Sequence, residues 1–348
     1  MTAPTTTTDT LAVTDAVPLP DPALAPPIPG LRARFFRDVA DYDRLADVIG
    51  AAMVADGVPY RPTAANLRIE MEANDGANRF EDVVLVEVDG RVVAQTNVER
   101  MVRDDTPMYR IEGNVHPDYR RQGIGRWLFD WTIERSRARA AREDPRAAVK
   151  LNAWVEDRSV GNLALLHQAG FTPVRHFFLM RRDHLDDIPD APLPDGLEIR
   201  PVEEAHRRAI LEAENEAFRD HWGHHEMTES TYTTTFAKPE LDTDLWVVAW
   251  DGDQIAGVVQ NWIWPDENEA LGVKRGWLEH ISVRRPWRRR GVARAITAAS
   301  LVRLREAGMT EGMLGVDSEN PNGALGLYEG LGFSQASRAT AYRRDLWD

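Results

Sequence analysis

The same order of sequence signals occurs twice along this chain, and this repetition constrains the fold more than any single motif. Each copy has an Asp-Gly pair between two β-rich segments, at Asp89-Gly90 and at Asp251-Gly252, and each closes with a Gly-Phe pair, at Gly170-Phe171 and at Gly332-Phe333. Equivalent positions lie between 162 and 168 residues apart. A chain of 348 residues is long enough for about two domains. We therefore expect two domains of the same fold in tandem.

Both copies predict the same series of strands and helices. In each, a short strand and a helix precede a hairpin, because Asp-Gly between β-rich segments is typical of a tight turn. A further strand ends at Val115 or at Val283, and an Arg- and Gly-rich turn then leads into a long helix, over residues 126–142 or 294–307. Each half is therefore expected to be an α/β domain in which helices pack on a sheet.

Two Pro-rich segments lie outside the copies. Residues 1–30 contain a Thr tract and many prolines with little apolar periodicity, so we expect a disordered leader. Residues 184–196 are rich in Pro and Asp and favour neither helix nor strand, which predicts a flexible interdomain linker. The expected domains cover residues 31–183 and 197–348.

Composition excludes several classes of function. The chain has no Cys, which removes disulfides, thiolate metal sites and an acyl-cysteine intermediate. A formal charge of −14 argues against binding along a nucleic-acid backbone. No apolar segment approaches the roughly 20 residues of a membrane span, and the N-terminus lacks a secretory signal pattern. We expect a cytoplasmic protein, monomeric or homodimeric, with neither a nucleic acid nor a membrane as partner.

The turn before the long helix carries the clearest chemistry. It reads Arg120-Arg121-Gln122-Gly123-Ile124-Gly125 in the first copy and Arg288-Arg289-Arg290-Gly291-Val292-Ala293 in the second, so both fit Arg-x-x-Gly-x-Gly/Ala. Small residues let a ligand approach the backbone, and successive N–H groups before a helix attract phosphate, which flanking Arg side chains reinforce. Neither a dinucleotide fingerprint nor a Walker P-loop fits the turn. A merely structural turn with solvated Arg side chains is the alternative, and the duplication disfavours it.

The segment from Val115 to Gly125 resembles the acetyl-CoA signature of the GCN5-related N-acetyltransferase (GNAT) superfamily. The second copy matches nearly as well, and residues 316–333 resemble the closing motif of that superfamily. The resemblance implies a bent mixed β-sheet flanked by helices in each half, with the pantetheine arm of acetyl-CoA between splayed strands. It also implies direct transfer of an acetyl group to an amine. A small-molecule acceptor is the leading hypothesis; the alternatives are a protein lysine or N-terminal acetyltransferase and a non-catalytic acyl-CoA-binding scaffold.

The resemblance assigns contacts with acetyl-CoA to the strand end, the turn and the helix start of each copy. In the second copy these residues are Ile281, Ser282, Val283, Arg288, Arg289, Arg290, Gly291, Val292, Ala293, Arg294 and Asn320, with Asn322 as an alternative to Asn320. In the first copy they are Val115, Arg120, Arg121, Gln122, Gly123, Ile124, Gly125 and Arg126.

Two residues of the second copy are candidate catalytic groups. Strand alternation over residues 277–283 places Glu279 on an apolar face, where burial makes a carboxylate a better base. His280 then points to the opposite face, unless a bulge interrupts the strand. Tyr328 precedes Gly332-Phe333 by the spacing of the superfamily's thiolate-protonating tyrosine. The alternatives are a structurally paired Glu279 and a Tyr328 that only packs in the core.

The first copy lacks both catalytic candidates, so we expect it to have kept the fold and lost turnover. The aligned pairs are Ile111 with Glu279, Glu112 with His280, and His167 with Tyr328.

Aromatic residues of the second copy are candidates for the acceptor site. Trp222 follows the first helix of that copy and Trp262 lies on a later strand; core packing is the alternative for both. The neighbouring His221, His224 and His225 suggest a metal, but their spacing is not HExxH and no thiolate assists, so we expect none.

Overall fold

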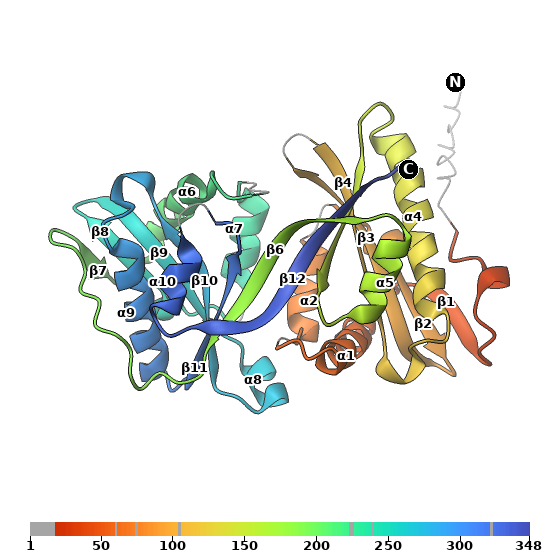
Figure 1. The fold of residues 1–348 in the computed structure, drawn as a ribbon, viewed down its shortest axis with the longest axis horizontal. Helices are drawn as coiled ribbons and strands as arrows, with labels where there is room; N and C mark the ends of the chain where they lie inside the picture. The colour runs from red at the N-terminus through yellow and green to blue at the C-terminus, as the bar shows by residue number, and fades with distance from the viewer. Residues whose placement is uncertain are drawn as a thin grey trace, which may run out of the picture.

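The computed structural model describes residues 18–59, 61–73, 76–103, 106–222, 226–238, 240–320 and 323–348. Their strands form one twelve-stranded mixed sheet with helices on both of its faces (Figure 1). Within this described part of the chain, no helix is long and apolar enough to cross a bilayer.

The first half contains the predicted strand, helix, hairpin, further strand and long helix in that order. Its elements are β1 (Leu31–Phe35), α1 (Ala40–Ala55), α2 (Ala64–Glu72), α3 (Arg79–Asp82), β2 (Val83–Val88), β3 (Arg91–Arg103), β4 (Thr106–Val115), α4 (Ile124–Glu143), β5 (Lys150–Glu156), α5 (Val160–Gln168) and β6 (Thr172–Arg182). Of these, α2, α3 and β6 were not predicted.

The second half repeats this order with two differences: its described residues contain no α-helix equivalent to α3, and α8 is added before the strand that is equivalent to β4. Its elements are β7 (Glu198–Arg200), α6 (Arg207–Phe218), α7 (Glu229–Ala237), β8 (Val247–Asp251), β9 (Gln254–Ile263), α8 (Pro265–Leu271), β10 (Arg275–Val283), α9 (Val292–Glu306), β11 (Glu311–Asp317), α10 (Ala324–Glu329) and β12 (Ser334–Asp345). The two hairpins are confirmed, although the second turns at Gly252-Asp253, one residue later than the Asp-Gly pair indicates.

Each half contains one parallel pair of strands that separates along its length. Strands β4 and β5 pair only over residues 108–110 of β4, and β10 and β11 pair only over residues 275–277 of β10. The other neighbouring strands in the sheet are antiparallel. The mixed, splayed sheet expected for each half is therefore confirmed.

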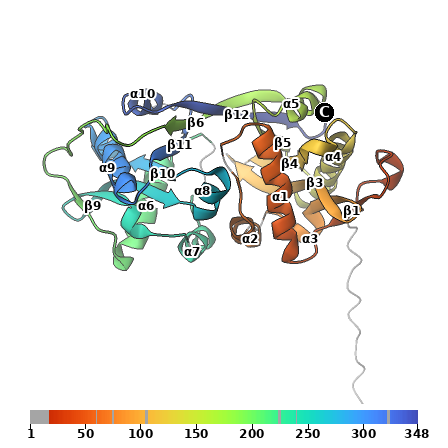
Figure 2. The same ribbon diagram turned by 90° about the horizontal axis from the view of Figure 1, so that it is seen from below.

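The two halves exchange their closing strands. The sheet has the order β1-β2-β3-β4-β5-β12-β6-β11-β10-β9-β8-β7, so β12 of the second half pairs with β5 of the first, and β6 of the first half pairs with β11 of the second. Figures 1 and 2 show β6 and β12 running side by side between the halves. The expected boundaries at residues 183 and 197 thus separate the repeats along the chain but not in space.

The expected flexible linker lies against the second half. Leu185 is buried there, and Ile188, Ala191 and Leu193 pack against the same core. These contacts arise because apolar side chains alternate with Pro and Asp in this segment, so an extended chain presents them to one surface.

Residues 18–30 of the expected disordered leader also pack on the domain. The indole N–H groups of Trp127 and Trp131 on α4 donate to the backbone oxygens of Asp21 and Pro18, both at 2.9 Å. Leu19, Ala25 and Ile28 cover the core beside that helix. Proline removes backbone donors but leaves carbonyl acceptors, and the two Trp side chains satisfy these. Residues 1–17 lie outside the described residues.

Candidate active site

The Arg- and Gly-rich turns of the two halves have the same backbone geometry. Gly123 and Gly291 begin α4 and α9 with φ values of 96° and 90°, in the left-handed region that favours glycine. Two residues before each glycine, Arg121 and Arg289 also have positive φ, at 63° and 58°. The predicted equivalence of the two turns is confirmed.

The first Arg of each turn is held by protein groups, which the sequence did not indicate. Arg288 donates to the backbone oxygens of Val283 and Ala217 and pairs with Asp220 at 2.9 Å. Arg285 pairs with the same carboxylate, and together these guanidinium groups hold the pKa of Asp220 below its usual range. In the first half, Arg120 makes the same contacts with Val115, Ala52 and Asp56.

A pocket of about 560 Å³ lies beside the turn of the second half, where β10 and β11 separate. Residues of the strand end, the turn and the helix start line it together, whereas Arg290 does not. The predicted residues that do are Ile281, Ser282, Val283, Arg288, Arg289, Gly291, Val292, Ala293, Arg294, Asn320, Glu279 and Tyr328. Asn322 lies outside the described residues.

The space in front of the turn of the second half is open. A Cβ added to Gly291 would meet nothing within 4 Å, so the space in front of the turn is open to a phosphate. The helix that begins there directs its free N–H groups to the same place.

The turn of the first half is covered. A Cβ added to Gly123 would lie 3.4 Å from Cβ of Pro26, which belongs to the segment packed on α4. Of the residues predicted to bind acetyl-CoA in this half, Val115 and Gly125 line a larger cavity. The others line neither this cavity nor the pocket of the second half: Arg120, Arg121, Gln122, Gly123, Ile124 and Arg126.

A β-bulge interrupts β10 at the predicted catalytic position. Glu279 pairs with Gln260 and Ser282 with Val258, so β10 has one extra residue between them. His280 lies in the bulge with a φ of 48°. Both Glu279 and His280 line the pocket, so the exception that the sequence left open, a bulge in this strand, is the one that applies. Strand β4 of the first half pairs with β3 in an uninterrupted register.

Tyr328 lies on α10 at the far side of the same pocket. Its ring packs edge-on against Phe333, with centroids 6.1 Å apart. Burial alone raises the pKa of its hydroxyl, so the group is protonated at neutral pH. The equivalent residue of the first half, His167, is exposed at the end of α5.

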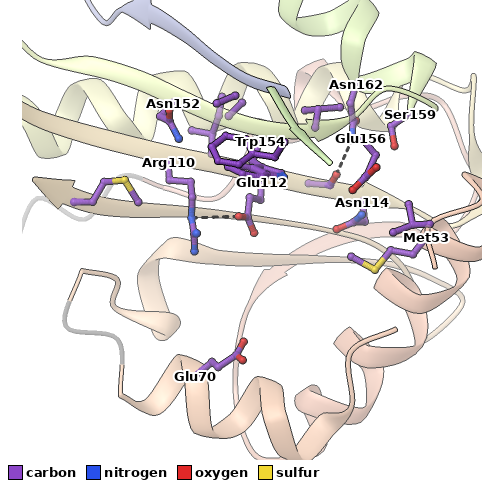
Figure 3. A pocket seen from close by; sticks show the side chains of 18 of the residues that line it. Met53, Glu70, Arg110, Glu112, Asn114, Asn152, Trp154, Glu156, Ser159 and Asn162 are labelled. Atoms are coloured by element: carbon purple, nitrogen blue, oxygen red, sulfur yellow. Dashed lines mark hydrogen bonds and ion pairs between the residues drawn. The ribbon is translucent and has the colours of Figure 1, made fainter. Parts of the chain in front are cut away.

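A larger cavity, of about 1130 Å³, lies between the halves. Glu279 and His280 line both this cavity and the smaller pocket, so the two spaces meet at the bulge. In the part formed by the first half, polar side chains surround the cavity, among them Arg110, Glu112 and Glu70 (Figure 3). Arg110 pairs with Glu112 at 3.2 Å, so two of these charges offset each other.

Aromatic side chains form two walls of the larger cavity. Trp222 and Trp262, the predicted acceptor residues, both line it. Trp262 stacks on Trp264 with centroids 5.1 Å apart, and Trp222 lies 5.9 Å from Phe177 of the exchanged strand β6. Among the described residues, no group of three potential metal ligands occurs; His224 and His225 lie outside them.

The comparisons with known proteins agree with this geometry. Residues 207–333 match the model of the Acetyltransferase (GNAT) family. A mycothiol acetyltransferase from Salinispora arenicola is 32% identical over 67% of this chain and 72% of its own length. The chain belongs to the GNAT acetyltransferase family. It is therefore an acyltransferase.

Some solved structures resemble nearly the whole chain, and not only its second half. A GCN5-related N-acetyltransferase from Sphaerobacter thermophilus matches with a TM-score of 0.69 and 29% identity, over 92% of this chain and 97% of that one. A tandem GNAT protein from the clavulanic acid biosynthesis pathway matches in fold, with a TM-score of 0.64 and 17% identity, over 91% and 98% of the two chains.

The sequence interpretation missed what the first half contributes to the junction. Trp154 and Glu156 on β5 and Phe177 on β6 line both the pocket and the larger cavity. Burial raises the pKa of Glu156 above its ordinary value. No local sequence signal marks these residues, because the exchange of strands brings them to the site.

Proposed function

We propose that this acetyltransferase moves the acetyl group of acetyl-CoA to the amine of a small molecule held between its halves, and that the second half performs the chemistry. One observation carries the proposal. The pocket beside the open turn and the cavity between the halves meet at Glu279 and His280. A donor in the first space and an acceptor in the second can therefore react at the bulge.

The open turn is the proposed site of the pyrophosphate of acetyl-CoA. Backbone N–H groups from Gly291 onward and the side chains of Arg289 and Arg294 would bind it. Acetyl-CoA supplies an activated thioester when bound. The separation of β10 and β11 leaves room for its pantetheine arm to approach the bulge.

Glu279 and Tyr328 are the proposed proton acceptor and donor. Glu279 faces the cavity between the halves, where its carboxylate attracts an ammonium group and takes a proton from it, directly or through water. Tyr328 holds its proton because of burial and can give it to the departing sulfur. The first half has neither group, nor an open turn, so we assign it a role in acceptor binding instead.

The acceptor is proposed to be a polar amine with a flat, apolar face. Trp222 and Trp262 offer ring surfaces, while Glu279 and Glu156 offer carboxylates to an ammonium group. The relative from Salinispora arenicola is named for mycothiol, so the desacetyl precursor of mycothiol is the first compound to test.

Release of CoA from acetyl-CoA tests the proposal against a panel of amines. The panel contains desacetylmycothiol, glucosamine, a polyamine and a lysine peptide. Saturable CoA release with one of the small amines, together with its acetylated product by mass spectrometry, is the expected result. Turnover of the peptide alone would favour a protein acetyltransferase. If the protein binds acetyl-CoA but releases no CoA with any amine of the panel, a non-catalytic scaffold would be favoured.

A further inference from the structure

A buried carboxylate lies directly behind the imidazole of the bulge. Glu214 on α6 is fully buried, and its Oε1 lies 3.6 Å from Nδ1 of His280. His280 itself is not buried, because 46% of its side chain is exposed and it lines both the pocket and the cavity. The imidazole thus stands between a hidden carboxylate and the reaction site.

Glu214 is fixed in place and lines neither of the two spaces. The side-chain nitrogen of Gln260 donates to its Oε2 at 2.6 Å, which leaves Oε1 directed to His280. A buried carboxylate costs free energy unless it is paired, so a second partner for Oε1 is expected. His280 is the partner that the bulge provides.

The surroundings of His280 favour its protonated form. Partial loss of hydration in the site acts to lower the pKa of the imidazole, but the carboxylates of Glu214 and Glu279 outweigh this effect, and the pKa is raised above its ordinary value. Lys238, which directly follows α7, opposes them weakly, and the ring of Phe218 packs edge-on against the imidazole with centroids 5.9 Å apart. The imidazole is therefore a stronger base than a free histidine.

We infer that His280, positioned by Glu214, carries the proton of the acceptor amine away from Glu279 to solvent. An ammonium N–H bond breaks, its electron pair stays on nitrogen, and the proton passes to Glu279. A carboxylic acid is a stronger acid than an imidazolium, so the proton moves on to Nε2 of His280 while Glu214 compensates the new charge. The exposed imidazole then releases it to water.

The remaining bonds balance in the same step. The nitrogen pair forms the C–N bond as the C–S bond breaks, and sulfur receives the proton of Tyr328. The product nitrogen loses its second proton, which returns to Tyr328 through water and replaces the proton that the sulfur received. One proton in total leaves through His280.

The first half provides an internal comparison. Glu112 occupies the position of His280 there, on a strand with no bulge. Arg120 and Arg288 make equivalent contacts with α1 and α6, so the two helices can be aligned. The residue of the first half that is equivalent to Glu214 is then Ile49 or Gly50. The half without the predicted catalytic groups thus also lacks this carboxylate and imidazole pair.

Nuclear magnetic resonance of the full chain tests the pair without any acceptor. The inference depends on the proposed function, but this readout does not. With ¹⁵N-labelled histidine, His280 should be protonated on Nδ1 when neutral and titrate above pH 6.5, the ordinary value. Glu214→Gln keeps the volume but presents an amide donor, so it should lower the pKa of His280 and shift the proton to Nε2. Glu216→Gln on the same helix is the matched control and should change neither.

Kinetics with acetyl-CoA and desacetylmycothiol test the proton path. We expect His280→Gln to lower kcat by about 10- to 100-fold, at the lower end of general acid–base effects, with little change in the KM for acetyl-CoA. Glu214→Gln should lower kcat as well and move the acidic limb of its pH profile to lower pH. The double variant should be no slower than His280→Gln, because both substitutions disrupt the same pair of residues.

Two results would overturn the inference. One is a His280 that titrates identically in the wild type and in Glu214→Gln; the wild-type tautomer alone decides the point if that variant does not fold. The other is full activity of His280→Gln. If desacetylmycothiol is not turned over at all, the acceptor of the proposed function fails, while the titration still decides whether Glu214 positions His280.

Discussion

Tyr328 and His167 show how single residues make the two halves unequal. They occupy equivalent helices before equivalent Gly-Phe pairs. Tyr328 is buried and stays protonated, whereas His167 is exposed and packs edge-on against Tyr342. Only the buried phenol lines a pocket that also contains an open turn.

Removing the Tyr328 hydroxyl should separate chemistry from binding. Tyr328→Phe deletes the proton donor and keeps the ring, so kcat should fall about 10²- to 10⁴-fold while the Kd for acetyl-CoA stays nearly unchanged. Stopped-flow CoA release and calorimetric titration measure the two quantities. His167→Phe is the matched control and should keep wild-type kcat. The reverse pattern would assign the chemistry to the first half.

Glu267 makes the stability of the second half depend on pH. Its carboxylate is buried, pairs with Arg275 at 3.2 Å and accepts from the indole of Trp277. Burial raises the pKa of Glu267 to about 7, against the opposing effects of these two partners. The folded state therefore holds a proton that the unfolded state has already lost between about pH 4.5 and 7.

The free energy of unfolding should therefore fall as pH rises through that window. The loss attributable to Glu267 is at most about 3.5 kcal/mol, since one pKa unit corresponds to about 1.4 kcal/mol and the pKa rises from 4.5 to about 7. Urea unfolding of the wild type and of Glu267→Gln at pH 5 and 7.5 measures it as a difference between the two proteins. Glu269→Gln, exposed on the same helix, should behave as the wild type. Parallel curves for wild type and Glu267→Gln would contradict the shifted pKa.

At the scale of elements, the two Arg- and Gly-rich turns were predictable because their signals are local. The positive φ of Gly123 and Gly291 follows from residues next to each other in the sequence. The surroundings of each turn do not follow from neighbouring residues. Pro26, which covers the first turn, lies about 100 residues away along the chain. For the same reason the sequence did not indicate the partners of Arg288, since Ala217 lies on α6 and Asp220 just after it.

Equivalent substitutions in the two turns should have different effects on binding. Gly291→Glu places a charged side chain where a Cβ meets open space, so it should block the phosphate site and raise the Kd for acetyl-CoA at least about tenfold through charge repulsion. Gly123→Glu should leave that Kd unchanged, since its turn is already covered. Isothermal titration should give one acetyl-CoA per wild-type chain. Two sites of similar affinity would show that Pro26 does not close the first turn.

The bulge of β10 is an element that the sequence left open. Strand alternation over residues 277–283 is regular in the sequence, and nothing in it specifies an extra residue. The close approach of β9 accommodates the bulge, because Gly257 lies where a Cβ would be 2.9 Å from the backbone oxygen of Ser282. Register depends on such contacts between strands, so the positions of Glu279 and His280 relative to the pocket required the structure.

At the scale of the whole molecule, the repeat predicted two copies of one fold but not their connection. The strands that follow the two Gly-Phe pairs, β6 and β12, were not predicted, and no local pattern specifies their partners. In the structure each of these strands pairs with the other half: six residue pairs join β6 to β11, and seven join β12 to β5. Each half therefore completes its sheet with a strand of the other.

Cutting the chain between the halves should leave them assembled. A protease site inserted after Asp195, which is exposed at the end of the segment that joins them, would yield fragments 1–195 and 196–348. Each fragment lacks one strand of its own sheet, so separation would leave unpaired edges on β5 and β11. We expect the cleaved fragments to elute as one species in size-exclusion chromatography and to separate only in denaturant. Fragment 1–195 expressed alone should aggregate. Recovery of two stable, separately folded fragments from the cleaved protein would instead mean that the halves are independent domains.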